Sequence, residues 1–321
     1  MSNIKFVGII ILNYNNWEDT INCIESIEKH NTANIKYFVV DNGSTHTDVV
    51  HQLDMYFSKR FKDNYSGKIT TDITDNKLKK INFIISDDNT GYAKGNNKGL
   101  SIAFQDEDVE DILILNNDVL FVEDIIPRLI EYRNKIDDCA FISPVLYKRN
   151  GIDLDYNCAR TNITNWNLLI TYLFWYQDFF SYISNYSHKT NVLLVSPELL
   201  RNDIIKIELP SGSCMFSSKE LWKNMDGFDG DTFLYYEENI LYKRIHGMGL
   251  NNYLIPSLKC IHLGAQSSKR IKSWFTINEQ FKSSMYYLDR YGDLSLAQRI
   301  AFIICKKWFP IKIKLIKHLS R

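Results

Sequence analysis

The sequence predicts an α/β fold in which helices flank a mixed, mainly parallel sheet. Four short apolar runs rich in β-branched residues recur in the N-terminal part of the chain, at 6–12, 37–40, 82–85 and 112–115. Apolar runs without polar alternation fit strands that are covered on both faces, as in a parallel sheet. A stretch with helical spacing separates the first two runs, and this order of strand, helix and strand is typical of α/β domains.

The first predicted helix covers residues 17–29. Ile21, Ile24 and Ile27 recur there at helical spacing, and Glu18 and Asp19 stand near its beginning, where acidic side chains favour the helix dipole. In sheets of this kind, ligands gather at the carboxyl ends of the strands. The turns that follow the four strands are therefore where we expect the chemistry.

The bulk composition is that of a folded globular protein. The chain has 321 residues, of which 45% are hydrophobic and 24% are charged, so wholesale disorder is not expected. Its formal net charge is zero, so we expect no nucleic-acid partner. The six cysteines include no C-x-x-C pair, which suits reduced thiols in a cytosol. No apolar stretch approaches the length of about 18 residues that suggests a membrane span.

Three segments differ from this pattern. Residues 58–80 are polar and rich in lysine, and we expect them to form a surface insertion. Residues 166–186 are densely aromatic and belong to an expected insertion at 161–200. They could form a lid, a lipid-facing surface or a dimer contact, so a homodimer stays open. The third segment is the C-terminal tail.

The tail is basic and helical in pattern. After Asp293, seven formal positive charges and no negative one are interleaved with apolar residues, and Pro310 is expected to break the tail into two parts. Such interleaving is typical of segments that lie on anionic lipid. We expect peripheral attachment to a membrane through this tail. A solvated amphipathic helix is the alternative.

Each of the four predicted strands ends in a polar turn. The first ends in Asn13-Tyr14-Asn15, and the second in Asp41-Asn42-Gly43, which could contact a nucleoside or only form an Asx turn. The third leads to residues 89–97, whose two glycines permit close approach of a phosphate or sugar. The fourth ends in Asn116-Asn117-Asp118, whose carboxylate could hold Mg²⁺ or Mn²⁺ or belong to an ordinary turn.

The order and spacing of these motifs resemble those of family 2 glycosyltransferases, particularly the rhamnosyltransferase-like branch. The resemblance covers about residues 5–265 and continues at residues 211–215, 227–229 and 233–238. It implies a Rossmann-like fold of the GT-A type. It also implies an inverting enzyme that transfers a sugar from a UDP- or dTDP-sugar to a glycan acceptor.

The resemblance also implies roles for individual residues. It assigns Asp118 to the metal, Mn²⁺ or Mg²⁺, and His262 either to the same metal or to a structural role. It assigns the acceptor region to Trp222, Asp229 and Tyr235, although core packing is the alternative for each. The donor-binding residues that it implies are Leu12, Tyr14, Asp41, Asn89, Gly91, Gly95, Asn97, Asn116 and Asn117.

The same resemblance places the catalytic base at Glu238, with Glu237 beside it. Two adjacent acids repel, which raises the pKa of one of them toward the range useful for a base. The alternative is an acidic helix start that only favours the dipole. Three departures from the family pattern are Asn116 and Glu238, which replace aspartates, and Ile240, which stands where an aspartate is common.

The expected organisation has three parts. Residues 1–118 form the nucleotide-sugar half of the GT-A domain, 119–270 form the acceptor and catalytic-base half, and 271–321 form the helical, membrane-associating tail. The expected setting is the cytoplasmic face of a membrane, with a lipid-linked glycan as acceptor in bacterial-type surface polysaccharide synthesis such as capsule or O-antigen. A non-catalytic carbohydrate-binding or scaffold protein is the alternative, and a sugar-nucleotide pyrophosphorylase is a weaker one because the glycine- and arginine-rich loop of such enzymes is missing after the first strand.

Overall fold

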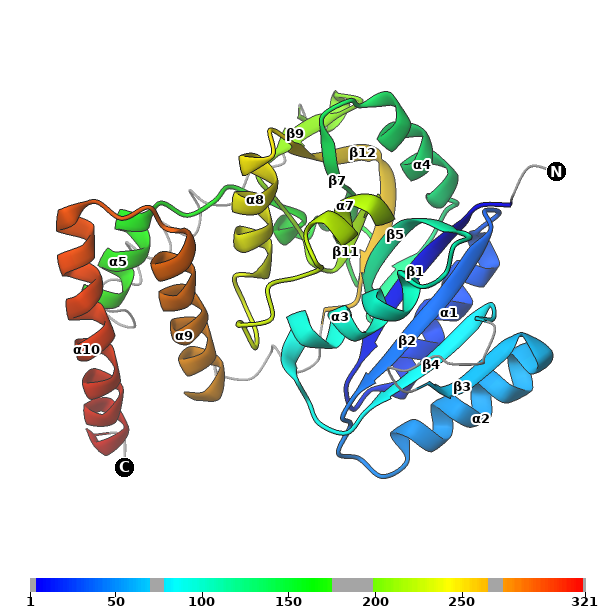
Figure 1. The fold of residues 1–321 in the computed structure, drawn as a ribbon, viewed down its shortest axis with the longest axis horizontal. Coiled ribbons are helices and arrows are strands. Elements are labelled where there is room, and N and C mark those ends of the chain that lie inside the picture. The colour runs from blue at the N-terminus through cyan, green and yellow to red at the C-terminus, as the bar shows by residue number, and fades with distance from the viewer. Residues whose placement is uncertain (1–3, 70–77, 175–198, 265–273, 320–321) are drawn as a thin grey trace.

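A single ten-stranded sheet forms the centre of the protein (Figure 1). The computed structural model describes residues 4–69, 78–174, 199–264 and 274–319. The strand order is β3-β4-β2-β1-β5-β11-β7-β12-β6, and β9 pairs with β12. The strands of this sheet are β1 Phe6–Asn13, β2 Ile35–Asn42, β3 Tyr65–Ile69, β4 Ile81–Ser86, β5 Val109–Asn116, β6 Val119–Phe121, β7 Cys139–Lys148, β9 Ile205–Ile207, β11 Cys214–Ser218 and β12 Asn251–His262.

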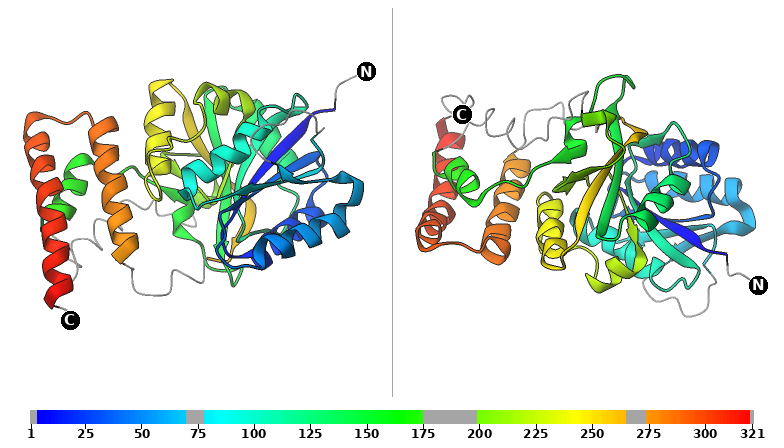
Figure 2. Two further views of the ribbon diagram at one scale, coloured as in Figure 1. Left: turned by 60° about the horizontal axis from the view of Figure 1, so that its bottom comes forward. Right: turned by 90° about the horizontal axis from the view of Figure 1, so that it is seen from above.

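The helices cover both faces of the sheet and continue beyond one end of it (Figures 1 and 2). A separate two-stranded sheet pairs β8 Ala159–Arg160 with β10 Leu209–Pro210. The helices are α1 Trp17–His30, α2 Val49–Phe61, α3 Gly91–Ala103, α4 Ile126–Lys135, α5 Asn165–Phe174, α7 Lys219–Asn224, α8 Glu237–Gly247, α9 Trp274–Tyr291 and α10 Leu296–Leu319.

The predicted mixed, mainly parallel sheet is confirmed. The five strands β3, β4, β2, β1 and β5 all run parallel. β11 runs antiparallel to β5 and β7, and β6 runs antiparallel to β12. The four predicted strands are β1, β2, β4 and β5, and the predicted first helix is α1, which the Asn16 side chain caps by accepting from the Asp19 N–H. Strands from before and after residue 118 belong to this one sheet, and the expected division of the domain into two halves at residue 118 stays a prediction.

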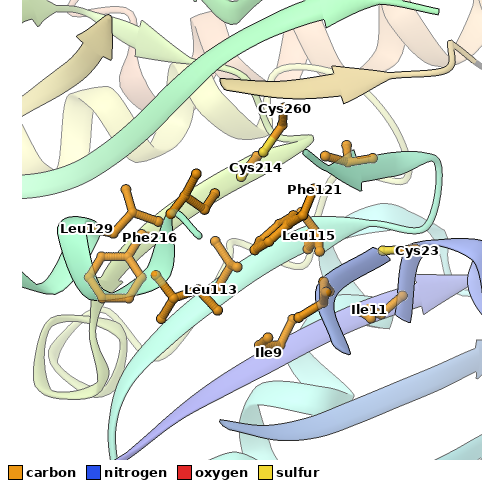
Figure 3. Close-up of a cluster of buried hydrophobic side chains, with 14 of the residues drawn as sticks. Ile9, Ile11, Cys23, Leu113, Leu115, Phe121, Leu129, Cys214, Phe216 and Cys260 are labelled. Carbon is orange, nitrogen blue, oxygen red and sulfur yellow. The ribbon is translucent and has the colours of Figure 1, made fainter. Parts of the chain in front are cut away.

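The apolar strands are buried on both faces because alternate side chains enter different cores. Ile9 and Ile11 of β1 belong to the core beneath α1, α2 and α4, whereas Ile10 belongs to the core beneath α3, α7 and α8. Figure 3 shows Ile9 and Ile11 lying in the same layer as Leu113 and Leu115 of β5. Packing on both faces therefore fixes these strands beside one another, with their carboxyl ends at the same edge of the sheet.

The expectation of a surface insertion at 58–80 is wrong for the part that the structure describes. The chain to Phe61 completes α2, and β3 adds an edge strand to the sheet. The cause is aromatic packing, since Phe57 lies 5.9 Å from Tyr65 and 5.3 Å from Phe83 between ring centroids. Residues 70–77 lie outside the described residues.

The helices α5, α9 and α10 pack together at the end of the molecule farthest from α1 and α2 (Figures 1 and 2). Three aromatic rings in their core contact one another, with centroid distances of 5.2 Å from Tyr172 to Phe281, 5.0 Å from Tyr172 to Phe309 and 4.3 Å from Phe281 to Phe309. The first part of the aromatic segment 166–186 therefore packs against the C-terminal helices. Residues 175–186 of that segment lie outside the described residues.

Helix α10 continues through Pro310, so the expected break there is wrong. Pro310 is exposed, and on that side water can bind the carbonyl that loses its N–H partner. The neighbouring Phe309 is buried in the aromatic core and holds the helix in place. Within the described part of the chain, no helix has both the length and the apolar character needed to cross a membrane.

Replacing Phe309 with alanine should lower the free energy of unfolding by about 3–5 kcal/mol, because the change removes a buried ring and leaves a cavity. Urea unfolding followed by circular dichroism measures the loss. Ile311→Ala is the matched control, because Ile311 is exposed on the same helix and its removal should cost less than about 0.5 kcal/mol. Equal losses in the two variants would contradict the packing described here.

Candidate functional site

A cavity of about 350 Å³ opens beyond the carboxyl end of β5, where several distant parts of the chain meet. Asn116 comes from β5, Gly212 and Ser213 come from the turn before β11, and Arg160 comes from β8. The first turn of α8 supplies both acids of the predicted catalytic pair. The cavity also receives Tyr92, Thr161, Ile163, Leu209, Leu234, Tyr235, Tyr236, Asn239 and Gln280.

Asp118 and His262 lie together beside this cavity. Pairing of β6 with β12 places His262 opposite Val119 and so next to Asp118. The Nε2 atom of His262 is 3.3 Å from Asp118 Oδ2 and 3.5 Å from Ser213 Oγ. The other carboxylate oxygen of Asp118, Oδ1, is buried without a hydrogen-bond partner. A buried carboxylate oxygen without a partner is costly, so this position suits a cation.

Asp155 orients the His262 ring from the opposite side. Its Oδ2 is 2.7 Å from His262 Nδ1, which leaves Nε2 directed at Asp118. Burial by itself would lower the pKa of His262, but hydrogen bonds and charges from Asp118 and Asp155 outweigh it and raise the pKa to about 10. A carboxylate on the far ring nitrogen is the usual support of a histidine that binds a metal. A cation held by Asp118 and His262 would take the place of the Nε2 proton.

The donor set fits a divalent cation that shares its ligands with a substrate. Oxygen and imidazole donors suit Mn²⁺, and Mg²⁺ is held in many sites by one or two carboxylates plus substrate phosphates. In the described ranges, no group of three or more histidine, cysteine or acidic side chains is placed to hold a metal. The pair Asp118 and His262 therefore needs oxygen ligands from a bound diphosphate or from water.

The acids Glu237 and Glu238 begin α8 after a strained turn. Tyr235 and Tyr236 have φ values of 76° and 71°, a left-handed conformation that is uncommon for non-glycine residues. Glu238 Oε1 accepts a hydrogen bond from the Gly212 N–H at 3.0 Å and lies 3.2 Å from Arg160 Nη2. Glu238 is therefore a paired carboxylate that faces the cavity.

Glu237 is the acid whose pKa rises. Burial first, and then the charge of Glu238, raise its pKa from the ordinary 4.5 to about 8. Its Oε1 lies 3.5 Å from the Thr232 hydroxyl. One of the two adjacent acids thus has a raised pKa, as expected, but it is Glu237 and not the expected base Glu238, which is paired with Arg160.

Arg160 and Asp155 contact the candidate site residues, and the sequence did not reveal them. Arg160 sits in a strand of two residues, and it reaches Glu238 only because β8 pairs with β10. Asp155 precedes a single turn of 3₁₀ helix. Neither residue has a flanking motif, so the only signal for them is spatial.

The predicted nucleoside contacts are placed unequally. Tyr14 is 43% exposed just beyond β1, where its ring can meet a ligand. Asp41 is buried and accepts hydrogen bonds from Asn13 Nδ2 at 2.7 Å, the Ser44 hydroxyl at 2.6 Å and the Ser44 N–H at 3.0 Å. This is the Asx-turn alternative, and a nucleoside contact of Asp41 stays a prediction.

The glycines of α3 serve close packing in this structure and do not form an open phosphate cradle. A Cβ on Gly95 would lie 2.6 Å from Leu12 Cδ1, so Gly95 lets α3 approach β1. Gly91 has a φ of 84°, and a Cβ there would collide with the carbonyl oxygen of Phe233. Asn89 accepts a hydrogen bond from the Gly91 N–H at 3.0 Å. These residues shape the turn, and contact with a donor stays a prediction for them and for Leu12.

Asn97 and Asn117 are also occupied by the fold. The Asn97 amide bonds both the N–H and the carbonyl of Phe228, each at 2.8 Å, and so fixes the loop before α8. Asn117 Nδ2 donates to Thr20 Oγ1 at 3.0 Å and thereby braces the β5 turn on α1. Unlike Asn97 and Asn117, Asn116 lines the cavity, where it donates to Ser213 Oγ at 3.2 Å.

The structure corrects one predicted acceptor residue, Trp222, and acceptor contact stays a prediction for Asp229. Trp222 is fully buried, with ring centroids 5.1 Å from Phe141 and 4.8 Å from Phe228, so it belongs to the core. Asp229 accepts hydrogen bonds from the hydroxyls of two tyrosines of α9, Tyr286 at 2.8 Å and Tyr291 at 2.6 Å, and so anchors its loop. Tyr235 does line the cavity.

Ile240 is buried in the same core as α5, α9 and α10. An aspartate at that position would place a charge in apolar surroundings, at a high cost in stability. Packing against the C-terminal helices therefore explains this departure from the family pattern, and it no longer argues against catalysis.

Comparison with known proteins gives two findings. The model of the family described as Glycosyl transferase family 2 matches residues 8–188, more than half of the chain. The crystal structure of GalNAc-T7 with UDP, GalNAc and Mn²⁺ is similar, with a TM-score of 0.58 and 12% sequence identity over 98% of this chain and 58% of that chain. This likeness shows a GT-A fold, and this chain spans little more than half of the GalNAc-T7 chain. No curated protein sequence matches significantly.

Replacing Glu237 with glutamine should flatten the pH dependence of stability between about pH 4.5 and 8. In that window the unfolded chain has lost the Glu237 proton and the folded chain keeps it. The free energy of unfolding of the wild type therefore falls by up to about 1.4 kcal/mol per pH unit as the pH rises. The variant should match the wild type at pH 4 and exceed it at pH 8. Urea unfolding across this range measures the difference. Glu220→Gln, the same change at an exposed position, is the control, and parallel profiles for Glu237→Gln and wild type would refute the assignment.

Proposed function

This chain belongs to glycosyl transferase family 2, and we propose that it is an inverting glycosyltransferase acting on a nucleoside diphosphate sugar. One observation carries the proposal. The Gly212 N–H bonds Glu238 at 3.0 Å, and the neighbouring Ser213 hydroxyl lies 3.5 Å from His262 Nε2. Two adjacent residues thus connect the candidate base, which lines the cavity, with the candidate metal ligands beside it.

In this proposal, Asp118 and His262 hold Mn²⁺ or Mg²⁺. When bound, the cation supplies neutralisation of the charge that develops on the leaving diphosphate. The unpartnered Oδ1 of Asp118 and the Asp155-oriented ring of His262 support these two ligands. The donor we propose is a UDP- or dTDP-sugar, and the GalNAc-T7 structure of similar fold contains UDP and Mn²⁺.

Glu238 acts as the general base. It takes the proton from an acceptor hydroxyl in the cavity, and the hydroxyl oxygen forms a bond to the anomeric carbon while the bond from that carbon to the diphosphate breaks. Attack from the face opposite the diphosphate inverts the anomeric configuration. Arg160 and the Gly212 N–H hold the Glu238 side chain in place, and the raised pKa of Glu237 removes a competing negative charge near neutral pH.

The acceptor we propose is a glycan, lipid-linked, in bacterial-type surface polysaccharide synthesis such as capsule or O-antigen. The cavity is polar and of a size that suits a sugar ring, and Tyr235 lines it. The transferred sugar is a hexose or rhamnose in this proposal, and the enzyme is peripheral at the cytoplasmic face of the membrane. A carbohydrate-binding protein without activity is the alternative. The paired carboxylate of Glu238 favours catalysis over that alternative.

Replacing Asp118 with asparagine should remove the Mn²⁺-dependent part of nucleotide binding. The fold should persist, because the asparagine side chain has the shape of the aspartate side chain but lacks its negative charge. Thermal shift with UDP, GDP and dTDP, each with and without Mn²⁺, measures it, since a ligand specific for the native state raises the melting temperature. Asp124→Asn provides a matched change at an acid outside the cavity. An unchanged Mn²⁺ effect in Asp118→Asn would show that the cation is held elsewhere.

Replacing Glu238 with glutamine should leave nucleotide binding intact and lower the rate of transfer by about 10²–10⁴-fold, because the general base is lost. Release of nucleoside diphosphate in the presence of acceptor measures the rate, and Glu220→Gln is the control. Wild-type turnover in Glu238→Gln would move the base to another residue.

A further inference from the structure

Helix α10 carries apolar residues on two of its faces. Its inner face, with Phe302, Cys305 and Phe309, is buried against α5 and α9. On the opposite face, large apolar residues recur at spacings of three, four and seven residues. Their side chains remain about half exposed, at 54% for Ile300, 49% for Ile304 and 53% for Ile311. We call the second set the outer face of α10, and it consists of Ile300, Ile303, Ile304, Trp308, Ile311 and Leu315.

Basic side chains accompany the outer face. Arg299, Lys306, Lys307 and Lys314 are exposed along the same helix. The sequence holds no acidic residue after Asp293. A helix with apolar residues flanked by cations is suited to the boundary between lipid head groups and acyl chains. Burial of the apolar side chains and attraction of the cations to anionic head groups both add to the affinity there.

We infer that the outer face of α10 docks on an anionic lipid surface. Contiguous exposed apolar residues of this size mark an interaction site. A second copy of the chain is the competing occupant, but two outer faces in contact would bring their arginine and lysine side chains together with no acid from either helix to pair them. A lipid surface with anionic head groups supplies the missing charge and receives the apolar side chains.

The docked helix is connected to the cavity by α9. Ser283 of α9 donates to the carbonyl oxygen of Leu234 at 2.8 Å, and Tyr286 and Tyr291 bond Asp229 in the same loop. Gln280 of α9 lines the cavity itself. Docking through α10 would therefore hold the cavity at a set position relative to the membrane, which suits an acceptor anchored in lipid. This last consequence rests on the proposed function, whereas the docking does not.

The test uses the full chain and vesicles of phosphatidylglycerol mixed with phosphatidylcholine, with pure phosphatidylcholine for comparison. The wild type should co-sediment with the anionic vesicles, and high salt should weaken the binding. The triple variant Ile304→Ser, Trp308→Ser, Ile311→Ser should bind at least tenfold more weakly with an unchanged melting temperature, because these residues lie outside the buried core. Ile152→Ser, a change at a 78% exposed isoleucine distant in sequence, is the control and should bind as the wild type does.

Three results would overturn the inference. These are a wild type that does not bind anionic vesicles, a triple variant that binds them as the wild type does, or a wild-type dimer in light scattering that the triple variant abolishes while neither protein binds vesicles. The last result would assign the outer face to self-association. Deleting the tail is a poorer test, because removal of Phe309 opens the core of α5 and α9. Vesicle binding without nucleotide-sugar turnover would sink the proposed function and leave the docking intact.

Discussion

The Gly212 N–H donates to Glu238 Oε1 at 3.0 Å, and Ser213 places its hydroxyl 3.5 Å from His262 Nε2 and 3.2 Å from Asn116 Nδ2. The turn that holds both residues leads directly into β11, which is pinned between β5 and β7 in the middle of the sheet. A Cβ on Gly212 would come within 2.9 Å of Glu238 Oε1 and 3.1 Å of the Tyr92 hydroxyl. Glycine allows the acid to approach the backbone this closely, so the position of the Glu238 carboxylate depends on this turn.

The other parts of the site depend on the sheet in a similar way. β12 pairs with β6, and this pairing places His262 next to Asp118. β8 pairs with β10, and this pairing places Arg160 of β8 near Glu238. The C-terminal helices complete the arrangement, since α9 holds the loop that leads through the strained Tyr235 and Tyr236 into α8. The strain of these two residues is maintained by surrounding contacts, as expected where a backbone conformation presents functional side chains.

Local pattern is sufficient to predict four strands of the sheet, β1, β2, β4 and β5, and the polar turns that follow them. Continuous apolar runs imply strands buried on both sides, and the turns at their carboxyl ends then fall at one edge of the sheet, which makes Asp118 a candidate. The acids of α8 follow none of these strands, and they are implied by the family resemblance. The aromatic spacing of Phe57, Phe61 and Tyr65 does not by itself predict packing, so the sequence does not reveal β3. The sequence predicts a break at Pro310 because it does not reveal that Phe309 is anchored in the core.

Side-chain partners were the part that sequence could not supply. Gly91, Asn97, Trp222 and Asp229 belong to motifs that resemble a donor or acceptor site, yet their partners are a backbone carbonyl, a loop, a core and two tyrosines of α9. Asp155 and Arg160 show the converse, because only tertiary pairing brings them to His262 and Glu238. Motif residues thus mark the neighbourhood of the site, and the hydrogen bonds decide which of them face the ligand.

A crystal structure of the chain with UDP and Mn²⁺ would test the central claim most directly, with the cation located by its anomalous scattering. The account predicts one manganese peak within bonding distance of both Asp118 and His262 Nε2, with the diphosphate as a further ligand and Glu238 across the same cavity. A manganese peak on other residues, or a nucleotide bound outside this cavity, would contradict it.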